Sequence, residues 1–212
     1  LCTSATPEQV LELFGKAHCI PTGLQHGTVT VKHGGELYEI TTFRTEEAYS
    51  DGRHPDHVAF VPDVKEDLAR RDFTINAMAI SVNANNYGEL LDPFDGVGDI
   101  ERRLIRTPLD PDITFSDDPL RMMRAVRFAT RLGFDIYPET MNAIARNAER
   151  IKIITRERIA EELMKIMRTD NPSRGFMLLS ECGLLPYIFP ELAAMQGVDT
   201  MNGRAHKDNF MH

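Results

Sequence analysis

The spacing of apolar residues changes near residue 99, and this change limits the fold more than any other feature of the chain. Before it, residues 28–32 and 37–42 alternate apolar and polar side chains as strands do, and the turn residues 33–36 between them indicate a hairpin. After it, apolar residues recur at helical spacing. This order predicts an α+β fold, in which a small mixed β-sheet precedes an all-helical part, rather than alternating βαβ units.

Local signals place the individual elements. A first helix is predicted to begin after Thr6, because Pro7 suits the first turn and Gln9 completes a capping box, and to end at Gly15. Residues 45–69 are polar and rich in turn residues, which predicts a long loop of the kind that is usually functional or mobile. Further along, the pattern predicts a strand at 73–82 and a returning strand at 90–93. It also predicts six helices, at 99–103, 117–132, 138–149, 155–168, 172–182 and 189–195.

Composition excludes several classes of protein. The chain has 212 residues, of which 42% are hydrophobic and 26% charged, which is unlike a disordered or low-complexity sequence. No apolar run approaches the ~20 residues of a membrane-spanning helix. The three cysteines, Cys2, Cys19 and Cys182, are widely spaced and match neither a disulfide framework nor a zinc site, which favours a reducing, cytoplasmic setting.

The net charge of −8 argues against a generally basic nucleic-acid-binding protein, but the charge is unevenly distributed. Residues 1–100 carry a net charge of −9 and residues 169–212 of −2, whereas residues 101–168 carry +3, from 14 Lys and Arg against 11 Asp and Glu. A polyanion would therefore be tolerated best by the middle of the chain, although a solvated helical surface would explain the same charge.

A stripe of charged residues is the strongest candidate for a binding site. Four of them recur at every third position, at Asp118, Arg121, Arg124 and Arg127. A carboxylate only accepts hydrogen bonds and a guanidinium only donates them, whereas cytosine and adenine each present an amino donor beside a ring-nitrogen acceptor. Asp118 and Arg121, one helical turn apart, could therefore accept C or A and refuse U or G, which leaves Arg124 and Arg127 for phosphates or for positioning Asp118. Spacing alone also allows a helix-start ion pair with the other arginines turned outward.

Two further segments are weaker candidates. Arg70, Arg71 and Asp72 precede a predicted strand, where arginine would suit phosphate and Asp72 could accept from a ribose hydroxyl. Taken alone, this segment is better explained as a charged turn. Glu39 lies on a predicted strand and is a candidate metal ligand, but a magnesium site needs more than one protein oxygen, so a solvent-facing residue is the simpler interpretation.

Together these segments resemble the class II tRNA nucleotidyltransferases, the CCA-adding enzymes, and the bacterial poly(A) polymerases of the same family. The resemblance covers nearly the whole chain and rests on five motifs in the right order, at residues 39–44, 70–77, 91–96, 117–128 and 157–162. It implies a polymerase-β-like nucleotidyltransferase head at 1–104, a helical neck that recognises the nucleotide base at 105–168, and the start of a helical body at 169–212.

The resemblance also implies a reaction and its residues. The family adds C and A to the 3′ end of tRNA from CTP and ATP, without a nucleic-acid template and with Mg²⁺. By position, Asp118 and Arg121 would select the incoming base. Asp72 would sense the ribose and is expected, with Glu39, to be a catalytic residue; Glu39 would be the third catalytic carboxylate and a metal ligand. The other nucleotide-binding positions fall on Arg71, Asn76, Arg124 and Arg127, and residues 45–69 match the family's mobile loop.

The sequence departs from the family pattern in several places. The Gly-Gly…Arg segment and the Asp-x-Asp metal pair of the family are expected before Leu1, which is not an initiator residue, so we expect the middle of a longer protein whose 212 residues alone are inactive. Asp117 stands where the family usually has Glu, and its shorter arm could change how the base-selecting pair is oriented. Near residue 205 the chain resembles the start of an HD-type domain, with His206, Asp208 and His212 as candidate ligands, but a frayed terminus would look the same and no metal is assigned there.

Two alternatives stay open at this point. A poly(A) polymerase or an enzyme that adds only A would use the same Asp118 and Arg121. A non-catalytic module that binds RNA or nucleotides would explain a chain without the Asp-x-Asp pair.

Overall fold

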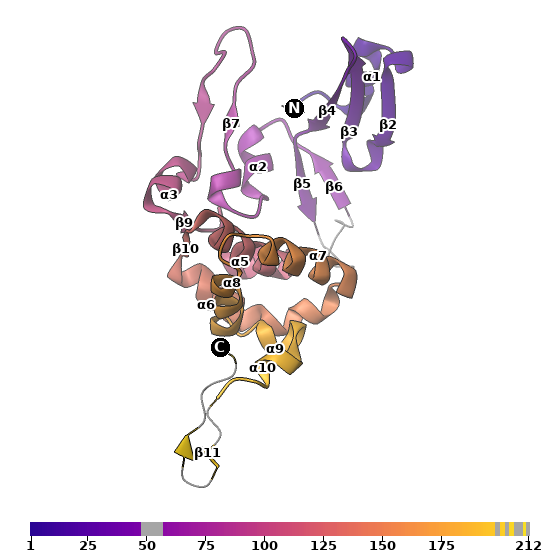
Figure 1. Ribbon diagram of the computed structural model, residues 1–212. Coiled ribbons are helices and arrows are strands. Elements are labelled where there is room, and N and C mark those ends of the chain that lie inside the picture. The colour runs from indigo at the N-terminus through magenta and orange to yellow at the C-terminus, as the bar shows by residue number, and fades with distance from the viewer. Residues whose placement is uncertain (48–56, 198–199, 202–203, 206–209, 211–212) are drawn as a thin grey trace.

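The computed structural model describes residues 1–47, 57–197, 200–201, 204–205 and 210 (Figure 1). One end of the molecule holds a four-stranded sheet with helix α1 beside it, and most of the other helices gather at the other end. The sheet has the order β1-β4-β3-β2 and consists of β1 (Cys2–Thr3), β2 (Cys19–Gly23), β3 (Thr28–His33) and β4 (Glu36–Thr42). Strand β1 pairs with β4 in parallel and the other pairs are antiparallel, so the sheet is mixed, and the predicted α+β class is confirmed.

The first helix, α1 (Pro7–Phe14), covers one face of this sheet and forms as its capping residues predict. The Thr6 side chain accepts a hydrogen bond from the Gln9 backbone N–H, and the Gln9 side chain accepts one from the Thr6 N–H. Val10 then packs with Val29 and Val31 of β3 in a small apolar cluster. Short 3₁₀ turns at Lys16–His18 and Leu24–His26 flank β2.

The prediction of a long loop without regular structure at 45–69 is wrong for the residues that the structure describes. Strands β5 (Arg44–Glu47) and β6 (His57–Phe60) pair antiparallel, and α2 (Val64–Ala69) follows. Asp63 caps α2, because its Oδ1 accepts the Lys65 N–H at 2.8 Å, and Leu68 is buried. Residues 48–56 lie outside the described residues.

The predicted strand at 73–82 is also largely wrong. Its first half forms a 3₁₀ turn, Thr74–Asn76, and only β7 (Ala79–Ile80) and β8 (Leu90–Leu91) pair, as a separate two-stranded sheet. The chain turns inward because Thr74 is tied to the helical part: its N–H donates to the carbonyl of Arg106, and its Oγ1 donates to the buried carboxylate of Asp99 at 2.7 Å. Beyond the turn, the β7–β8 hairpin extends away from the helices (Figure 1).

The second part of the chain is predominantly helical, as predicted. Its helices are α3 (Gly96–Arg102), α4 (Pro111–Asp117), α5 (Leu120–Leu132), α6 (Pro138–Asn147), α7 (Arg156–Met167), α8 (Pro172–Glu181), α9 (Leu185–Ile188) and α10 (Pro190–Ala193). A 3₁₀ segment, Ala148–Ile153, extends α6. Among the described residues, no helix combines the length and the apolar character needed to cross a membrane.

The helical part differs from the prediction in several details, and two of its helices, α4 and α9, were not predicted. Strands β9 (Leu104–Ile105) and β10 (Asp135–Ile136) form a short parallel pair, so this part is not purely helical, and β11 (Thr200–Met201) pairs with β12 (Arg204–Ala205). The helix expected at 117–132 begins only at Leu120. Pro119 disfavours the helical conformation of the residue before it, and Asp118 is accordingly extended, with φ −133° and ψ 97°.

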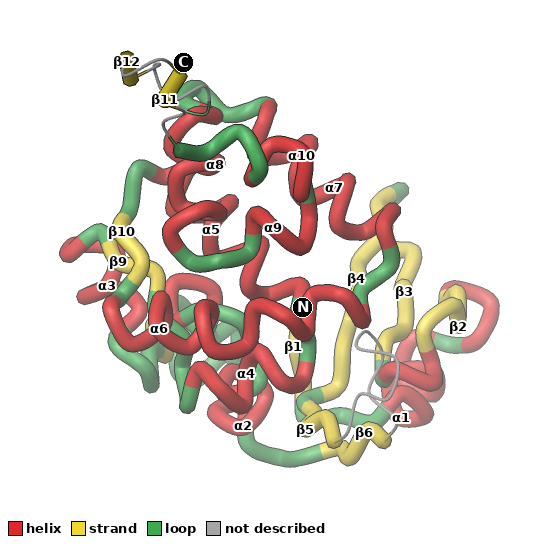
Figure 2. Tube along the Cα trace, turned by 90° about the horizontal axis from the view of Figure 1, so that it is seen from below, coloured by secondary structure: helices red, strands yellow, loops and turns green. Residues whose placement is uncertain are grey.

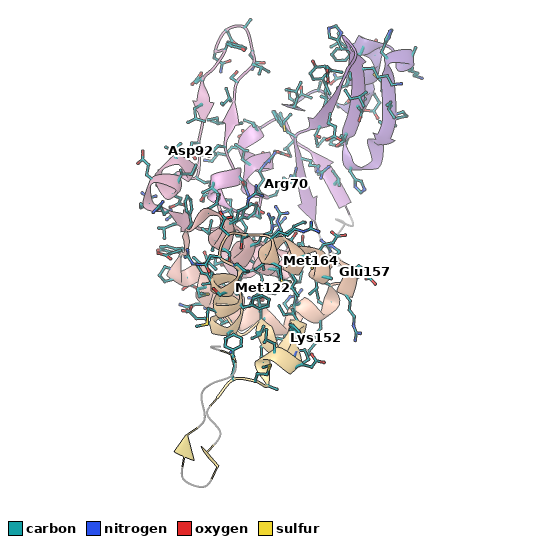
Figure 3. All side chains as sticks on the ribbon, in the orientation of Figure 1. Arg70, Asp92, Met122, Lys152, Glu157 and Met164 are labelled. Atoms are coloured by element: carbon teal, nitrogen blue, oxygen red, sulfur yellow. The ribbon has the colours of Figure 1, made fainter. Side chains whose placement is uncertain are left out.

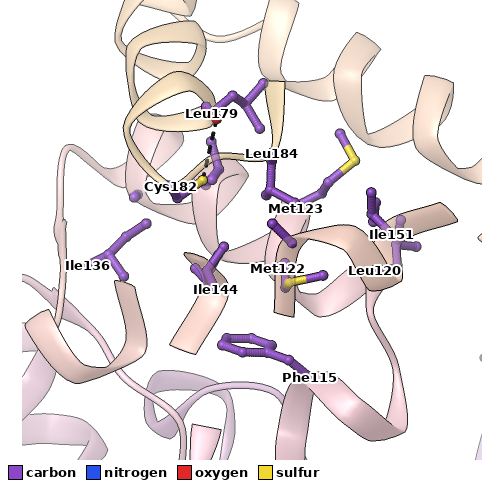
Figure 4. Close-up of a cluster of buried hydrophobic side chains, with 14 of the residues drawn as sticks. Phe115, Leu120, Met122, Met123, Ile136, Ile144, Ile151, Leu179, Cys182 and Leu184 are labelled. Atoms are coloured by element: carbon purple, nitrogen blue, oxygen red, sulfur yellow. Dashed lines mark hydrogen bonds between the residues drawn. The ribbon is translucent and has the colours of Figure 1, made fainter. Parts of the chain in front are cut away.

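One apolar cluster joins the helices, and it extends from Phe73 to Leu185 along the chain. Figure 4 shows its centre, where Met122 and Met123 of α5 lie among side chains from α4, α6 and α8. In the tube view of Figure 2, α5 is surrounded by other helices. The cluster includes residues of all three predicted units, and the boundaries at 104/105 and 168/169 stay predictions.

Candidate functional site

A cavity of about 540 Å³ lies where α2 and the 3₁₀ turn after it meet the first turns of α5 and α7. Figure 3 labels Arg70 at this junction. The lining residues come from segments that are up to 88 positions apart in the chain; they are Arg70, Arg71, Asp72, Asn76, Asp118, Leu120, Arg121, Arg124, Phe128 and Arg158. The structure thus brings together every residue predicted for a nucleotide site except Arg127 and Glu39.

Asp72 connects the two halves of the cavity. It is 7% exposed, and its Oδ1 accepts the Phe73 N–H at 2.9 Å and the Asn76 side-chain amide at 3.1 Å. Its Oδ2 accepts two hydrogens from Arg124, one from Nε at 2.8 Å and one from Nη2 at 2.5 Å. Because a carboxylate offers about four acceptor positions, these four donors occupy Asp72 fully.

A second carboxylate, Asp67, holds the arginines at the edge of the cavity, and it was not among the site residues predicted from the sequence. Asp67 is 1% exposed, and its Oδ1 accepts from Nε and Nη2 of Arg70 at 3.1 and 2.9 Å. Its Oδ2 accepts from Nη2 of Arg71 at 3.3 Å. The spacing of three and four residues, from Asp67 in α2 to the two residues that follow this helix, was the only signal in the sequence for these contacts.

Asp118 occupies the bend between α4 and α5. Its Oδ1 accepts the Leu120 N–H at 3.1 Å, and its Oδ2 lies 3.6 Å from Nη2 of Arg158. Burial raises the pKa of the Asp118 carboxyl above its ordinary value, although the charges of Arg158, Arg121 and Arg124 oppose this shift. The ion partner of Asp118 is therefore Arg158 of α7 rather than Arg121. Arg158 belongs to the motif at residues 157–162 but was not predicted as a site residue.

Two arginines of the cavity keep donors that no described residue uses. The guanidinium of Arg121 makes no hydrogen bond or ion pair with another described side chain, although it lies close enough to act electrostatically on Asp118. Nε of Arg71 is buried and has no hydrogen-bond partner among the described residues. A buried donor of this kind costs free energy unless a ligand or water accepts from it.

Arg127 does not line the cavity. It is 8% exposed, and its Nε donates to Glu162 of α7 at 2.6 Å, while its guanidinium stacks 4.1 Å from the ring centre of Phe128. Burial alone would raise the pKa of Glu162, but the hydrogen bond from Lys165 and the charge of Arg127 outweigh it, so this pKa lies below its usual value. In this structure Arg127 ties α5 to α7 and supports Phe128, which does line the cavity.

Glu39 is exposed on β4 and does not line the cavity. Across residues 1–47, 57–197 and the few later ones that are described, no three His, Cys, Asp or Glu side chains gather to hold a metal ion. The described residues therefore do not by themselves fit a magnesium site around Glu39. The candidate ligands His206, Asp208 and His212 lie outside the described residues.

The cavity as a whole is cationic, because its five arginines face two carboxylates. Guanidinium groups pair well with phosphate oxygens, and the adjacent Asp118 and Arg121 offer an acceptor beside donors. Chemically, the arrangement can bind an anion while it presents a carboxylate and a guanidinium to a flat polar group such as a base.

Comparisons with known proteins show which families this chain resembles. The family of the Poly A polymerase head domain matches residues 1–106, and the family described as "Probable RNA and SrmB-binding site of polymerase A" matches residues 133–196. The CCA-adding enzyme of Lactobacillus helveticus is 53% identical over 184 residues, which cover 87% of this chain and 45% of that protein. This chain therefore spans about half the length of the curated relatives that it matches.

Solved structures of a CCA-adding enzyme and of a tRNA nucleotidyltransferase also match this chain. The crystal structure of the Bacillus stearothermophilus CCA-adding enzyme in complex with CTP matches with a TM-score of 0.73 and 45% identity, over 86% of this chain and 42% of that one. A tRNA nucleotidyltransferase complexed with a primer tRNA and an incoming ATP analog matches with a TM-score of 0.64 and 31% identity, over 89% of this chain and 55% of that one.

Proposed function

This chain belongs to the family of the class II tRNA nucleotidyltransferases and bacterial poly(A) polymerases, and from that premise we propose that the protein adds C and A to the 3′ end of tRNA, using CTP and ATP and no nucleic-acid template. The observation that carries this proposal is the position of Asp118 and Arg121 in one cationic cavity with Arg71 and Arg124. The three free cysteines fit the reducing cytoplasm that a tRNA substrate would require.

Base selection follows from what the two side chains can accept and donate. The carboxylate of Asp118 accepts from the exocyclic amino group of cytosine or adenine, and the unused guanidinium donors of Arg121 meet the neighbouring ring nitrogen. Uracil and guanine present the opposite pattern and leave polar groups unpaired, at a cost of about 1–3 kcal/mol for each group. Arg158 positions Asp118, since it lies 3.6 Å from that carboxylate.

The phosphates and the ribose of the nucleotide would contact the side of the cavity that is formed by residues 70–76. Arg71 and Arg70 face the cavity with their orientation held by Asp67, and they suit the triphosphate. Asp72 already accepts four hydrogen bonds, so a ribose hydroxyl reaches it only by replacing one of the present donors, and the Asn76 amide at 3.1 Å is the weakest of them. Asp72 and Asn76 therefore sense the ribose as a pair.

Enzymes of this family generally use a divalent metal, and we propose Mg²⁺ for this protein. Glu39 is the one carboxylate among the described residues that the family motif assigns to it. None of the binding contacts proposed above involves the metal.

The test uses the natural full-length protein and a tRNA trimmed of its terminal CCA. We expect incorporation of CMP and AMP but not UMP or GMP, and we expect Asp118→Ala to weaken the choice of base more than the binding of nucleotide. No incorporation of any nucleotide would contradict the proposal and support a non-catalytic module. Products longer than CCA, made from ATP alone, would identify a poly(A) polymerase instead.

A further inference from the structure

The aromatic ring of Phe128 contacts two arginines that have different partners. Phe128 lies on α5, is partly buried and lines the cavity of the candidate site. The guanidinium carbon of Arg124 lies 5.6 Å from the centre of this ring, and that of Arg127 lies 4.1 Å from it. Both distances fall within the range of about 6 Å in which the face of an aromatic ring attracts a cation.

The ring also contacts the residue that follows Asp72. Phe73 is fully buried, and its ring meets that of Phe128 edge to face, with the ring centres 5.8 Å apart and the planes at 82°. This is a favourable arrangement of two aromatic rings. Because Arg124 and Phe128 are one helical turn apart on α5, the ring contact and the ion pair between Arg124 and Asp72 join the same two segments.

The two arginines carry like charges, so their approach to one ring is unfavourable unless each has a counter-charge. Arg124 donates two hydrogen bonds to Asp72, and Arg127 lies 2.6 Å from Glu162. The contacts therefore form the series Asp72, Arg124, Phe128, Arg127 and Glu162, which runs from the turn after α2 to α7. An apolar ring stands at the centre of this series of charges.

We propose that Phe128 is a positioning residue for the nucleotide: its ring fixes the guanidinium of Arg124 and, through it, the Asp72 carboxylate that meets the ribose. The inference rests on the proposed function and extends it to a side chain without a hydrogen-bonding group. The Arg124 side chain is 36% exposed and has several rotatable bonds. Without the ring, its guanidinium can turn from Asp72 toward solvent or toward the nucleotide phosphates. Asp72 then loses two of its four donors, and with them the position in which it accepts from a ribose hydroxyl.

Two other roles for Phe128 predict different experimental results. Phe128 packs against the apolar cluster of the helices, so a smaller side chain lowers stability whatever the ring does in the site. A surface on which the base stacks would be lost equally for a ribose and a deoxyribose nucleotide, and its loss would affect the larger adenine more than cytosine. Only a ring that acts through Arg124 and Asp72 changes the preference for the ribose hydroxyl.

The test is Phe128→Leu in the natural full-length protein, with CTP, dCTP and ATP as probes in separate binding titrations. Leucine stays apolar but lacks the ring. We expect the Kd for CTP to rise about fivefold, as for the loss of one partly exposed contact between a cation and a ring, and the Kd for dCTP to stay nearly unchanged. The preference for CTP over dCTP therefore falls by the same factor. Phe128→Tyr keeps the ring and should retain most of the preference.

Two further variants separate positioning from packing. Phe176→Leu is the matched control, because Phe176 of α8 packs against the same apolar cluster but does not line the cavity. This change should lower the Tm and leave the preference for CTP over dCTP as in the parent. Arg124→Gln removes the guanidinium that the ring fixes, so in this background Phe128→Leu should not lower the preference further.

Each contrary outcome overturns the inference. An unchanged preference in Phe128→Leu, with a Tm as low as that of Phe176→Leu, assigns the ring to packing. Equal losses of CTP and dCTP binding with a larger loss for ATP assign it to base stacking. A further fall in the Arg124→Gln background means that the ring does not act through this arginine, and a parent that binds CTP and dCTP equally has no ribose preference to support.

The proposed function fails separately. In that case the binding preferences change as expected, but the parent protein incorporates neither CMP nor AMP into trimmed tRNA.

Discussion

Arg124 on α5 donates two hydrogen bonds to one carboxylate oxygen of Asp72, which lies 52 residues earlier in the chain. This contact joins the turn after α2 to the helical part, and it determines where the two halves of the candidate site stand relative to each other. A change at either residue should therefore affect both stability and nucleotide binding.

Arg124→Gln should lower the free energy of unfolding by about 1–3 kcal/mol, because it leaves the buried Asp72 carboxylate without half of its donors. The loss is moderated by solvent, since the arginine side chain is 36% exposed. Urea unfolding measures it, and Arg124→Lys should lose less because one charged donor remains. Lys65→Gln, an exposed change in α2, should stay within about 0.5 kcal/mol. Equal stability of Arg124→Gln and the parent would show that the contact is not made in solution.

Asp67→Asn should raise the KM for CTP about tenfold with a smaller effect on kcat, because Arg70 and Arg71 lose the carboxylate that orients them. The substitution keeps the shape of the side chain, and circular dichroism checks that the fold is retained. Glu66→Gln changes the exposed neighbouring residue and serves as the matched control. A KM that is the same in both variants would exclude this positioning role for Asp67.

Selection against UTP should weaken as the pH falls, and at a higher pH than an exposed aspartate would allow, because burial raises the pKa of Asp118. Protonation turns one oxygen from an acceptor into a donor, which suits uracil better than cytosine. The ratio of kcat/KM for CTP and UTP, measured from pH 8 to about pH 5, tests this. Asp118→Asn should show a low ratio that no longer depends on pH, and a ratio in the parent that is flat across the range would count against the mechanism.

Glu162→Gln should lower the free energy of unfolding by about 2–4 kcal/mol, because Arg127 then lies buried without a counter-charge. The pKa of Glu162 is depressed in the folded state, so its contribution is present above the unfolded-state pKa and is lost as the pH falls through the folded-state pKa. The difference in the free energy of unfolding between the parent and Glu162→Gln should therefore disappear under acidic conditions.

The double variant Arg127→Met/Glu162→Leu should recover most of this stability, since two apolar side chains can replace a buried pair. A double-mutant cycle by urea unfolding gives the coupling between the two residues. Glu161→Gln, at the exposed position beside Glu162, is the control. A cycle with no coupling would mean that the pair does not hold α5 to α7.

Elements whose signals are local were predictable. The capping box at Thr6 and Gln9 and the hairpin between β3 and β4 depend on residues a few positions apart, and both formed as predicted. The prediction failed where a distant partner decides the conformation: Thr74 bonds to Asp99 and to Arg106, so its segment becomes a turn instead of a strand. A loop was predicted at residues 57–69 because this segment is polar and rich in turn residues, but it forms one strand and a capped helix.

For the site, the sequence by itself determined which chemical groups are present, their order, and the family to which they belong, because residue type and spacing are local properties. Only the tertiary structure decided which arginine faces the cavity. Arg124 and Arg127 are equivalent in spacing, yet one meets Asp72 and the other meets Glu162, since each partner comes from a different part of the chain. The same reason explains why Asp67 and Arg158 were not predicted as site residues. A carboxylate or a guanidinium positions another group only when it is buried and paired, and the neighbouring residues in the sequence reveal neither its burial nor its partner.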